Sequence, residues 1–427
     1  MSAKRVLIIC YYWPPAGGPG VQRWLKFVKY FGEFGIDPIV FVPDNAHYPL
    51  IDEAFEAEIP KNIKIIRFPI KEPYRFAKWF SKKKTKSMSS GIISEKAPSF
   101  LERAMLFIRG NLFIPDARIG WVKPASRFLQ KYLNENEIDT IITTGPPHSL
   151  HLIGQRLKRA LDIRWVADFR DPWTTIHYHK SLRLTEASAR KHKTLERAVL
   201  TEADAIVVTS PGTKKEFSEI TEKPITVITN GFDNALKAPR RPDEHFTLVH
   251  IGSLLTNRNP KVLWKVLAEL IETHPEFAAQ CRVKLVGAVS EDVLLSLNSY
   301  GLTNYTEEGG YVAHEEALQL QKNAQVLLLV EMNRPETKAI IPGKLFEYLS
   351  AGRPILALGP AGSDIKTIID ETKTGQFFSY SEERQIKDQI WNYFQDHMQQ
   401  KLEVDSASIE KYSRRALTKE MAQLLMG

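Results

Sequence analysis

The sequence contains very little cysteine: only Cys10 and Cys281 occur among 427 residues. Two cysteines far apart in the chain cannot form a disulfide framework or a four-ligand zinc site, and a free cysteine in a strand is usually a small buried apolar residue. The sequence also lacks a run of about 18 apolar residues, the length that a membrane-spanning helix requires. Its first residues lack the apolar region and the small-residue cleavage site of a signal peptide. We therefore expect a cytoplasmic protein without disulfides, structural zinc or a membrane span.

The composition also excludes a disordered or fibrous chain, because 43% hydrophobic and 25% charged residues are ordinary globular values. The length is two to three times the roughly 150 residues of one domain, so the sequence predicts at least two domains.

Short β-branched runs alternate with amphipathic segments in the first half of the chain. In the first such segment, one apolar stripe with helical spacing contains Val21, Trp24, Leu25, Val28 and Phe31. The runs read as buried strands of a parallel sheet, a βαβ arrangement, at residues 6–10, 36–42, 63–68, 138–144, 164–168, 205–209 and 225–228.

The alternation stops at the polar, proline-containing stretch NALKAPRRPDE, which is typical of a linker. It resumes with expected strands at residues 246–251, 283–286, 326–330, 354–358 and 376–378. The predicted organisation is an N-terminal Rossmann-like domain at 1–235, a linker at 236–244, a C-terminal Rossmann-like domain at 245–405, and a C-terminal helix at 406–427 that packs back toward the N-terminal domain.

A glycine-rich turn, PPAGGPGVQR, follows the first expected strand and leads into the first helix. Such a turn presents backbone N–H groups and the positive end of a helix dipole to an anion or a sugar hydroxyl. It is neither G-x-G-x-x-G nor a P-loop, and a turn that needs only flexibility is the alternative.

Two polar segments follow neighbouring strands of the same sheet, where ligands of open α/β sheets bind. TTGPPHS carries His148, with His151 one helical step later; neither has companions at zinc-site spacing, so a buried structural histidine is the alternative for each. DFRDPW places Asp168, Arg170 and Asp171 within four residues, and there the alternative is a structural ion pair.

The second half contains two segments suited to a nucleotide. HIGSLLTNRNP places Arg258 in a loop at an expected helix start, where a diphosphate would be favoured. In IPGKLFEYLSAGRPI, Lys344 can face a phosphate as a point charge. Glu347 lies one turn into the same helix, and its two oxygens can accept both hydroxyls of a ribose.

The net charge of +8 is concentrated in one segment. Residues 71–86, KEPYRFAKWFSKKKTK, carry seven basic residues and one acid, which is +6 of the total. The interleaved aromatics suit an anionic membrane surface, and a solvated basic loop is the alternative. The run is local and no aromatic RNA-reading motif accompanies it, so we expect no nucleic-acid partner.

Together these segments resemble the retaining glycosyltransferases of family 4. The resemblance covers nearly the whole chain in order, and the helix segment GKLFEYLSAGRPI is its most specific part. It implies the α/β GT-B fold, in which two Rossmann-like domains with parallel sheets face each other across a cleft. It also implies a nucleotide-sugar donor on the C-terminal domain and an acceptor on the N-terminal domain.

The resemblance further assigns site residues. The implied catalytic residues on the acceptor side are His148, Asp168, Arg170 and Asp171. The implied donor site comprises Gly18, Gly20, Ser253, Arg258, Gly343, Lys344, Leu345 and Glu347. Arg258 and Lys344 would hold the diphosphate, and Glu347 the ribose. Catalysis would be largely electrostatic, so neither a metal nor another cofactor is expected.

One position departs from the family pattern. A second glutamate usually lies eight residues before Glu347 and contacts the donor sugar, but this chain has Ala339 there. The nearest upstream carboxylates are Glu336 and Glu331. Glu336 is the candidate substitute, and the backbone amides of residues 337–340 are the alternative.

The predicted function is retaining transfer of a hexose-type sugar from a nucleotide-sugar donor to a glycan or lipid-linked acceptor, in surface polysaccharide synthesis, at the inner face of the membrane. A nucleotide-sugar epimerase of the same fold and a catalytically inactive scaffold of glycan assembly are the alternatives.

Overall fold

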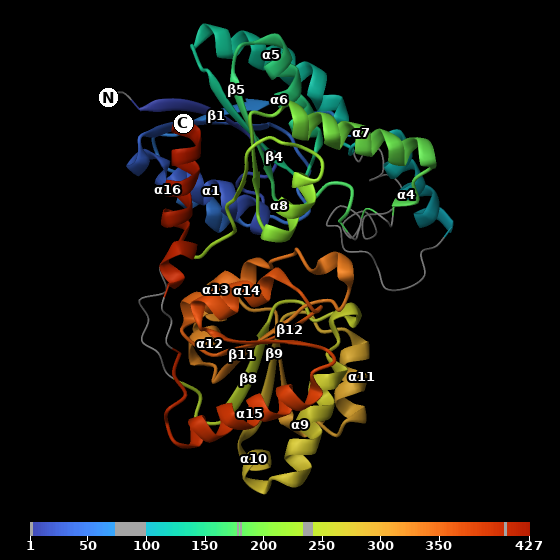
Figure 1. Cartoon of the computed structure of the whole chain (residues 1–427), viewed down its shortest axis with the longest axis vertical. Coiled ribbons are helices and arrows are strands. Elements are labelled where there is room, and N and C mark those ends of the chain that lie inside the picture. Colours follow the sequence, from blue (N-terminus) through green and yellow to red (C-terminus); the bar gives the residue numbers. More distant parts are fainter. Residues whose placement is uncertain (1–2, 73–99, 177–178, 180–181, 234–241, 405–407) are drawn as a thin grey trace. The chain divides into compact units, whose positions relative to one another are not determined.

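The computed structural model describes residues 3–72, 100–176, 179, 182–233, 242–404 and 408–427, without the side chains of residues 19 and 100–102. It divides into two compact units (Figure 1). The first comprises Met1–Asn230 and Arg414–Gly427, and the second comprises Gly231–Ser413. Most of the expected linker, residues 234–241, and of the basic segment, residues 73–86, lies outside the described residues.

The first unit is built on a seven-stranded parallel sheet with the order β3-β2-β1-β4-β5-β6-β7. These strands are β1 (Lys4–Ile9), β2 (Ile36–Pro43), β3 (Lys64–Phe68), β4 (Thr140–Gly145), β5 (Arg164–Phe169), β6 (Ala205–Val208) and β7 (Ile225–Val227). Its helices are α1 (Pro19–Phe31), α4 (Phe100–Leu112), α5 (Ile119–Glu135), α6 (Ser149–Ala160), α7 (Glu186–Glu202), α8 (Pro211–Ser218) and α16 (Arg414–Met426).

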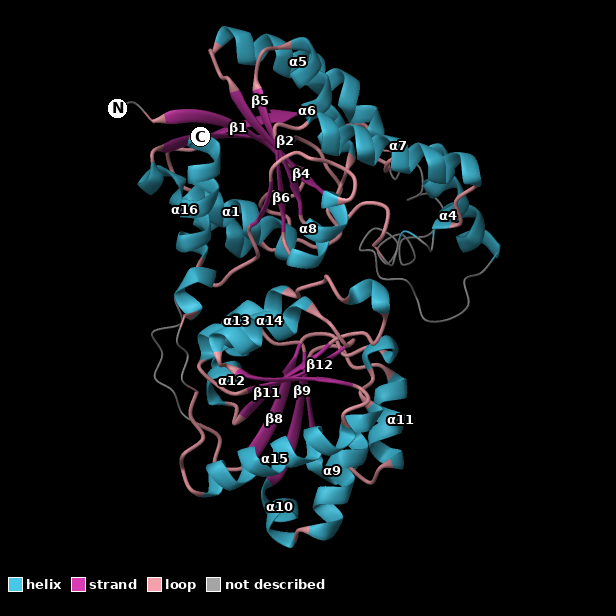
Figure 2. Cartoon of the chain, viewed as in Figure 1, coloured by secondary structure: helices cyan, strands magenta, loops and turns pink. Residues whose placement is uncertain are grey.

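Helices cover both faces of this sheet, as Figure 2 shows. Buried side chains of α5, α6 and α7 form the core on one face, and those of α1 and α16 form the core on the other. The predicted apolar stripe of α1 is at most 3% exposed. At the end of the chain, Arg414 Nη2 donates to Gln22 Oε1 at 3.0 Å, so α16 is tied to α1.

The second unit has a six-stranded parallel sheet with the order β10-β9-β8-β11-β12-β13. Its strands are β8 (Phe246–Ile251), β9 (Cys281–Val286), β10 (Thr306–Gly310), β11 (Val326–Val330), β12 (Ile355–Gly359) and β13 (Gly375–Ser379). Its helices are α9 (Lys261–Thr273), α10 (Pro275–Gln280), α11 (Glu291–Ser299), α12 (His314–Asn323), α13 (Gly343–Ala351), α14 (Asp364–Thr372) and α15 (Glu383–Met398). The two parallel sheets confirm the predicted pair of Rossmann-like domains.

One strand was not predicted. β10 has the sequence TEEGG and is largely exposed at the edge of the sheet, where it pairs with β9. Because an exposed edge strand needs no buried apolar residues, its sequence carries no strand pattern.

In each unit the strand order reverses direction beside the first strand. These switch points lie between β1 and β4 and between β8 and β11, and ligands of doubly wound sheets bind there, outside the carboxyl ends of the strands. The fold therefore marks one candidate position in each unit.

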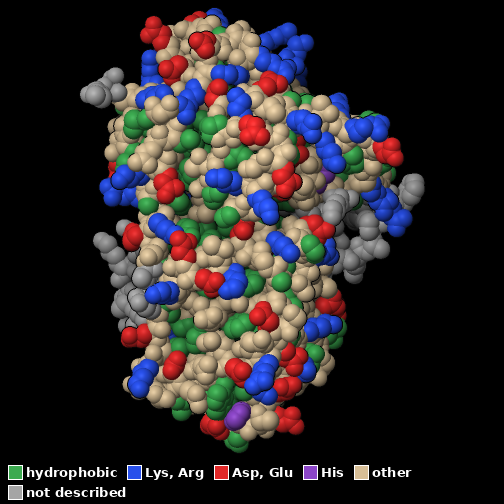
Figure 3. All heavy atoms as spheres, in the orientation of Figure 1, with side chains coloured by type: hydrophobic (Ala, Val, Ile, Leu, Met, Phe, Trp, Pro, Cys, Tyr) green, Lys and Arg blue, Asp and Glu red, His purple; other side chains and the backbone are tan. Residues whose placement is uncertain are grey.

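Two surface observations complete the fold. No helix among the described residues is long and apolar enough to cross a membrane. On the face in Figure 3, basic and acidic side chains are interspersed, as expected when +6 of the +8 charge belongs to residues 71–86.

Candidate functional site

The glycine-rich turn of the first unit follows β1 at the switch point. Gly18 caps the N-terminus of α1 with a φ of 97°, a backbone conformation that favours glycine. A Cβ atom on Gly20 would collide with the guanidinium of Arg170, which therefore lies directly on the turn. Arg170 also donates to the Pro146 carbonyl and lies over the ring of Tyr12. The segments after β1, β4 and β5 thus meet at Arg170.

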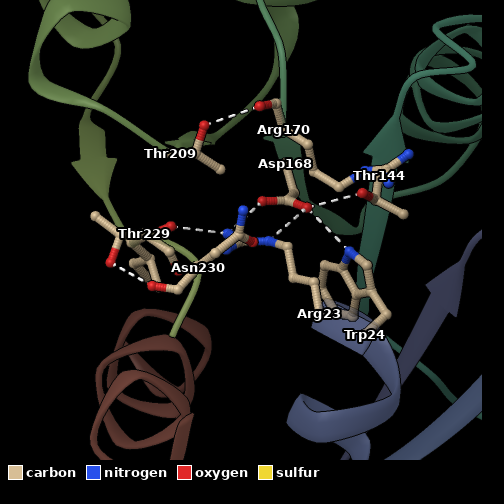
Figure 4. A network of polar contacts seen from close by, with 9 residues as sticks. Arg23, Trp24, Thr144, Asp168, Arg170, Thr209, Thr229 and Asn230 are labelled. Atoms are coloured by element: carbon tan, nitrogen blue, oxygen red, sulfur yellow. Dashed lines mark hydrogen bonds and ion pairs between the residues drawn. The ribbon is translucent and has the colours of Figure 1, made fainter. Parts of the chain in front are cut away.

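Asp168 lies in β5 and is fully buried, with its carboxylate directed at α1 (Figure 4). It accepts hydrogen bonds from Arg23 Nη2 at 2.8 Å and Nε at 3.4 Å, from Trp24 Nε1 at 2.9 Å, and from Thr144 Oγ1 at 2.8 Å. Arg23 also donates to two backbone carbonyls just after β7. The carboxylate joins α1 to the sheet, so the structural ion pair considered for Asp168 forms with Arg23 rather than with Arg170.

His148 begins α6 and is 8% exposed, with its ring stacked on Trp173 at a centroid distance of 4.9 Å and an interplanar angle of 2°. Neither ring nitrogen has a hydrogen-bond partner within the described part of the chain. Burial, helped by the charges of His151 and Arg170, holds the pKa of His148 well below its usual value, so its imidazole is neutral.

The two remaining polar residues of these segments have different surroundings. His151 is fully buried, with Nδ1 2.9 Å from Thr143 Oγ1, and burial lowers its pKa to about 3. Asp171 follows Arg170 directly and is half-buried; burial raises its pKa, and Arg170 opposes that effect. Among the predicted acceptor-side residues, Arg170, Asp171 and His148 thus lie at the switch point, whereas Asp168 faces the helix.

The second unit gathers five polar residues at the carboxyl ends of β8 and β11 and the first turns of α13. We call them the C-terminal cluster: His250, Arg258, Glu331, Lys344 and Glu347. Arg258 Nη2 lies 3.3 Å from Glu331 Oε2, and Lys344 Nζ lies 3.4 Å from His250 Nε2. Arg258 ends the short 3-10 helix Thr256–Arg258 after β8, and Glu331 directly follows β11.

The surroundings of Lys344 fix the position of its ammonium group and lower its pKa. His250 Nδ1 lies 3.0 Å from the Leu328 carbonyl and must donate to it, so Nε2 is free to accept from Lys344 Nζ. Gly252 has a φ of 110°, and a Cβ there would lie 3.0 Å from Lys344 Nζ. The pKa of Lys344 is lowered to about 8, chiefly by burial and also by the charge of Arg258, while the charge of Glu331 opposes this shift.

Glu331 is 2% exposed, and burial raises the pKa of its carboxyl group, an effect that Arg258 and Lys344 oppose. Its Oε1 atom has no hydrogen-bond partner within the described residues. The family resemblance assigned no role to His250 or Glu331. Their position at the ends of the two switch-point strands is the signal that could have found them.

The other predicted donor residues lie around this cluster or apart from it. Gly343 begins α13, and Glu347, one turn later, accepts from Gln321 Nε2 at 3.3 Å. Ser253 is exposed directly after Gly252. Leu345 does not join the cluster, because its side chain is fully buried in the core and its N–H donates to the Pro342 carbonyl.

Of the two carboxylates upstream of position 339, Glu331 belongs to the C-terminal cluster and Glu336 does not. Glu336, the candidate substitute, is exposed in the 3-10 helix Pro335–Thr337, whereas Glu331 is buried beside Arg258. Among the described residues, no group of three or more His, Cys, Asp or Glu side chains could hold a metal ion.

Part of the chain matches the model of a known protein family. The model of Glycosyltransferase Family 4 matches residues 92–236. No curated protein matches the sequence.

Solved structures similar to this chain extend the likeness to both units. Sucrose-phosphate synthase from Thermosynechococcus elongatus has a TM-score of 0.61 at 14% identity, covering 99% of this chain and 98% of its own. Anabaena HepE in complex with UDP and glucose has a TM-score of 0.60 at 13% identity, covering 99% of each chain. The lipopolysaccharide outer core galactosyltransferase WaaB has a TM-score of 0.57 at 14% identity, covering 99% of each chain. The full-length matches show the predicted GT-B fold.

Proposed function

We propose that this chain is a family 4 glycosyltransferase that takes its sugar from a nucleotide-sugar donor whose diphosphate binds Arg258 and Lys344. The observation that carries the proposal is the convergence of these two cations at the switch point of the second unit, with Glu347 one helical turn away. A guanidinium and an ammonium offer several donors to phosphate oxygens, and the carboxylate suits a ribose diol. The neighbour HepE, solved with UDP-glucose, supports this class of donor.

In the transfer step, the bond between the sugar and the leaving phosphate oxygen breaks and a glycosidic bond to the acceptor oxygen forms. The acceptor proton passes to an oxygen of the leaving diphosphate. The contribution of Arg258 and Lys344 is electrostatic, because they stabilise the negative charge that grows on the diphosphate. In the first unit, Arg170, Asp171 and His148 would contact the acceptor or the transferred sugar.

We further propose a hexose as the transferred sugar and a glycan or lipid-linked acceptor. The neighbour WaaB, a lipopolysaccharide outer core galactosyltransferase, supports a glycan acceptor. The membrane-binding role of residues 71–86 stays a prediction, because most of this segment lies outside the described residues.

A transfer assay tests the proposed function. Purified protein is incubated with each of several nucleotide sugars and a bacterial glycan or lipid-linked extract, and both nucleotide release and glycan mass are followed. We expect acceptor-dependent release that Glu347→Ala and Lys344→Ala each reduce strongly. Unchanged turnover in both variants would exclude this donor site. Conversion of the donor without acceptor would indicate an epimerase, and donor binding without conversion would indicate an inactive scaffold.

A further inference from the structure

Glu331 is the residue of the C-terminal cluster whose charge opposes its proposed ligand. A site for a diphosphate needs cations, yet this carboxylate lies 3.3 Å from Arg258 and acts electrostatically on Lys344. It is 2% exposed, so water does not screen its charge. A diphosphate bound by both cations would therefore lie beside a buried group of its own sign.

The contacts of Glu331 are unequal on its two carboxylate oxygens. Oε2 pairs with Arg258, whereas Oε1 is buried and has no partner among the described residues. Buried polar atoms are nearly always hydrogen-bonded in native proteins, and an exception needs an explanation. The Arg258 side chain is 27% exposed, so it reaches from the buried carboxylate toward solvent and an incoming ligand.

We propose that Glu331 is an internal counter-anion: it holds Arg258 in place of the donor diphosphate, which displaces it from the guanidinium when the nucleotide sugar binds. Glu331 is thus a positioning residue that acts through Arg258, and it limits how tightly the site holds a nucleotide. This inference rests on the proposed function, because it assigns the diphosphate to the same two cations.

The charged and titratable groups that face Glu331 determine how its effect on nucleotide-sugar binding depends on pH. They are Arg258, Lys344, which also contacts His250, and Tyr380, whose hydroxyl donates to the Glu331 carbonyl at 2.7 Å. Between pH 5 and 7, Lys344 stays charged, because its pKa is about 8. Over the same range His250 stays neutral, because its pKa is about 3, and Tyr380 stays protonated, because burial raises its pKa.

Burial raises the pKa of the Glu331 carboxyl group above its ordinary value. Its ionised form repels the diphosphate and its protonated form does not. Nucleotide-sugar affinity should therefore fall as the pH rises through the raised pKa of Glu331. A sugar diphosphate is a diester that does not titrate between pH 5 and 7, so the ligand itself adds no such dependence.

Isothermal titration calorimetry of the full chain tests this inference. UDP-glucose, UDP-N-acetylglucosamine and GDP-mannose are titrated into the wild type, and the one that binds tightest serves as the probe. At pH 7 we expect Glu331→Gln to bind it about tenfold more tightly than the wild type, because like charges at a binding site oppose association. The same variant should lose the dependence on pH, and Glu331→Asp, which keeps the charge, should retain it.

Glu308→Gln is the matched control, because it removes the same charge from the exposed strand β10 of the same unit. It should bind the probe like the wild type. Equal or weaker binding by Glu331→Gln, or a wild-type affinity that is constant from pH 5 to 7, would overturn the inference while leaving the proposed function intact. The wild-type pH series remains decisive even if Glu331→Gln fails to fold. If no nucleotide sugar binds the wild type, the proposed function fails, and the inference fails with it.

Discussion

Asp168 and Glu331 are two buried carboxylates, one in each unit, that lie near the carboxyl end of a strand and pair with an arginine. Asp168 accepts four hydrogen bonds, and its partner Arg23 is 2% exposed. Glu331 pairs at 3.3 Å with an arginine that is 27% exposed, and it keeps one oxygen unpartnered within the described residues. A fully satisfied buried pair stabilises the fold, whereas a half-satisfied one beside a solvent-reaching cation marks a site for a ligand.

The largest expected effect is on the stability of the first unit. Asp168→Asn leaves Arg23 buried without its counter-charge, and breaking a buried pair costs about 3 kcal/mol of the free energy of unfolding. Urea unfolding followed by tryptophan fluorescence measures this loss. Asp162→Asn, at an exposed position of the same unit, is the control and should change stability by less than about 0.5 kcal/mol. If Asp168→Asn were as stable as the wild type, the Asp168–Arg23 pair would not be the stabilising pair that distinguishes Asp168 from Glu331.

The next effect concerns ligand affinity in the second unit. Lys344→Met keeps an unbranched side chain, one atom shorter, but removes the charge, so we expect nucleotide-sugar affinity to fall about 30-fold. Calorimetry measures the loss. Lys366→Met removes the same charge from the exposed face of α14 and should leave affinity unchanged. Equal losses in the two variants would indicate a general charge effect rather than a site.

A smaller effect follows from the pKa of Lys344, about 8. Only the protonated ammonium attracts a diphosphate, so affinity should fall as the pH rises through 8 and be about tenfold weaker at pH 9 than at pH 7. Lys344→Arg keeps its charge at these pH values and should flatten the profile. A decline of equal size in Lys344→Arg would assign the titration to another group.

The smallest expected effect is the change in stability when Glu331 loses its charge. Glu331→Gln should change the free energy of unfolding by less than about 1 kcal/mol, because water can solvate the partly exposed Arg258. The urea unfolding used for Asp168→Asn measures it. A loss as large as that of Asp168→Asn would make Glu331 a structural residue like Asp168.

The sequence predicted most of the fold because buried parallel strands have a strong pattern. Runs such as VLLLV in β11 have no polar residue, and the stripe of α1 has helical spacing. The edge strand β10, TEEGG, was missed because it buries little. The joint position of Arg258 and Lys344 was predicted from the family resemblance, and the structure places both at the switch point of the second unit.

The roles of the two carboxylates could not be read from sequence. Asp168 was expected at the acceptor site beside Arg170, but its partner Arg23 lies 145 residues away and only the folded sheet brings them together. Glu331 lies 73 residues from Arg258, and no local motif includes both. Leu345 was expected at the donor site because it belongs to the motif, yet the rotation of α13 turns its side chain into the core.

The central claim is that the C-terminal cluster binds the donor diphosphate. Calorimetric titration of the nucleotide-sugar panel into the wild type and into the double variant Arg258→Met, Lys344→Met tests it most directly. We expect that one nucleotide sugar binds the wild type and shows no measurable binding to the double variant. Undiminished binding by a correctly folded double variant would contradict it.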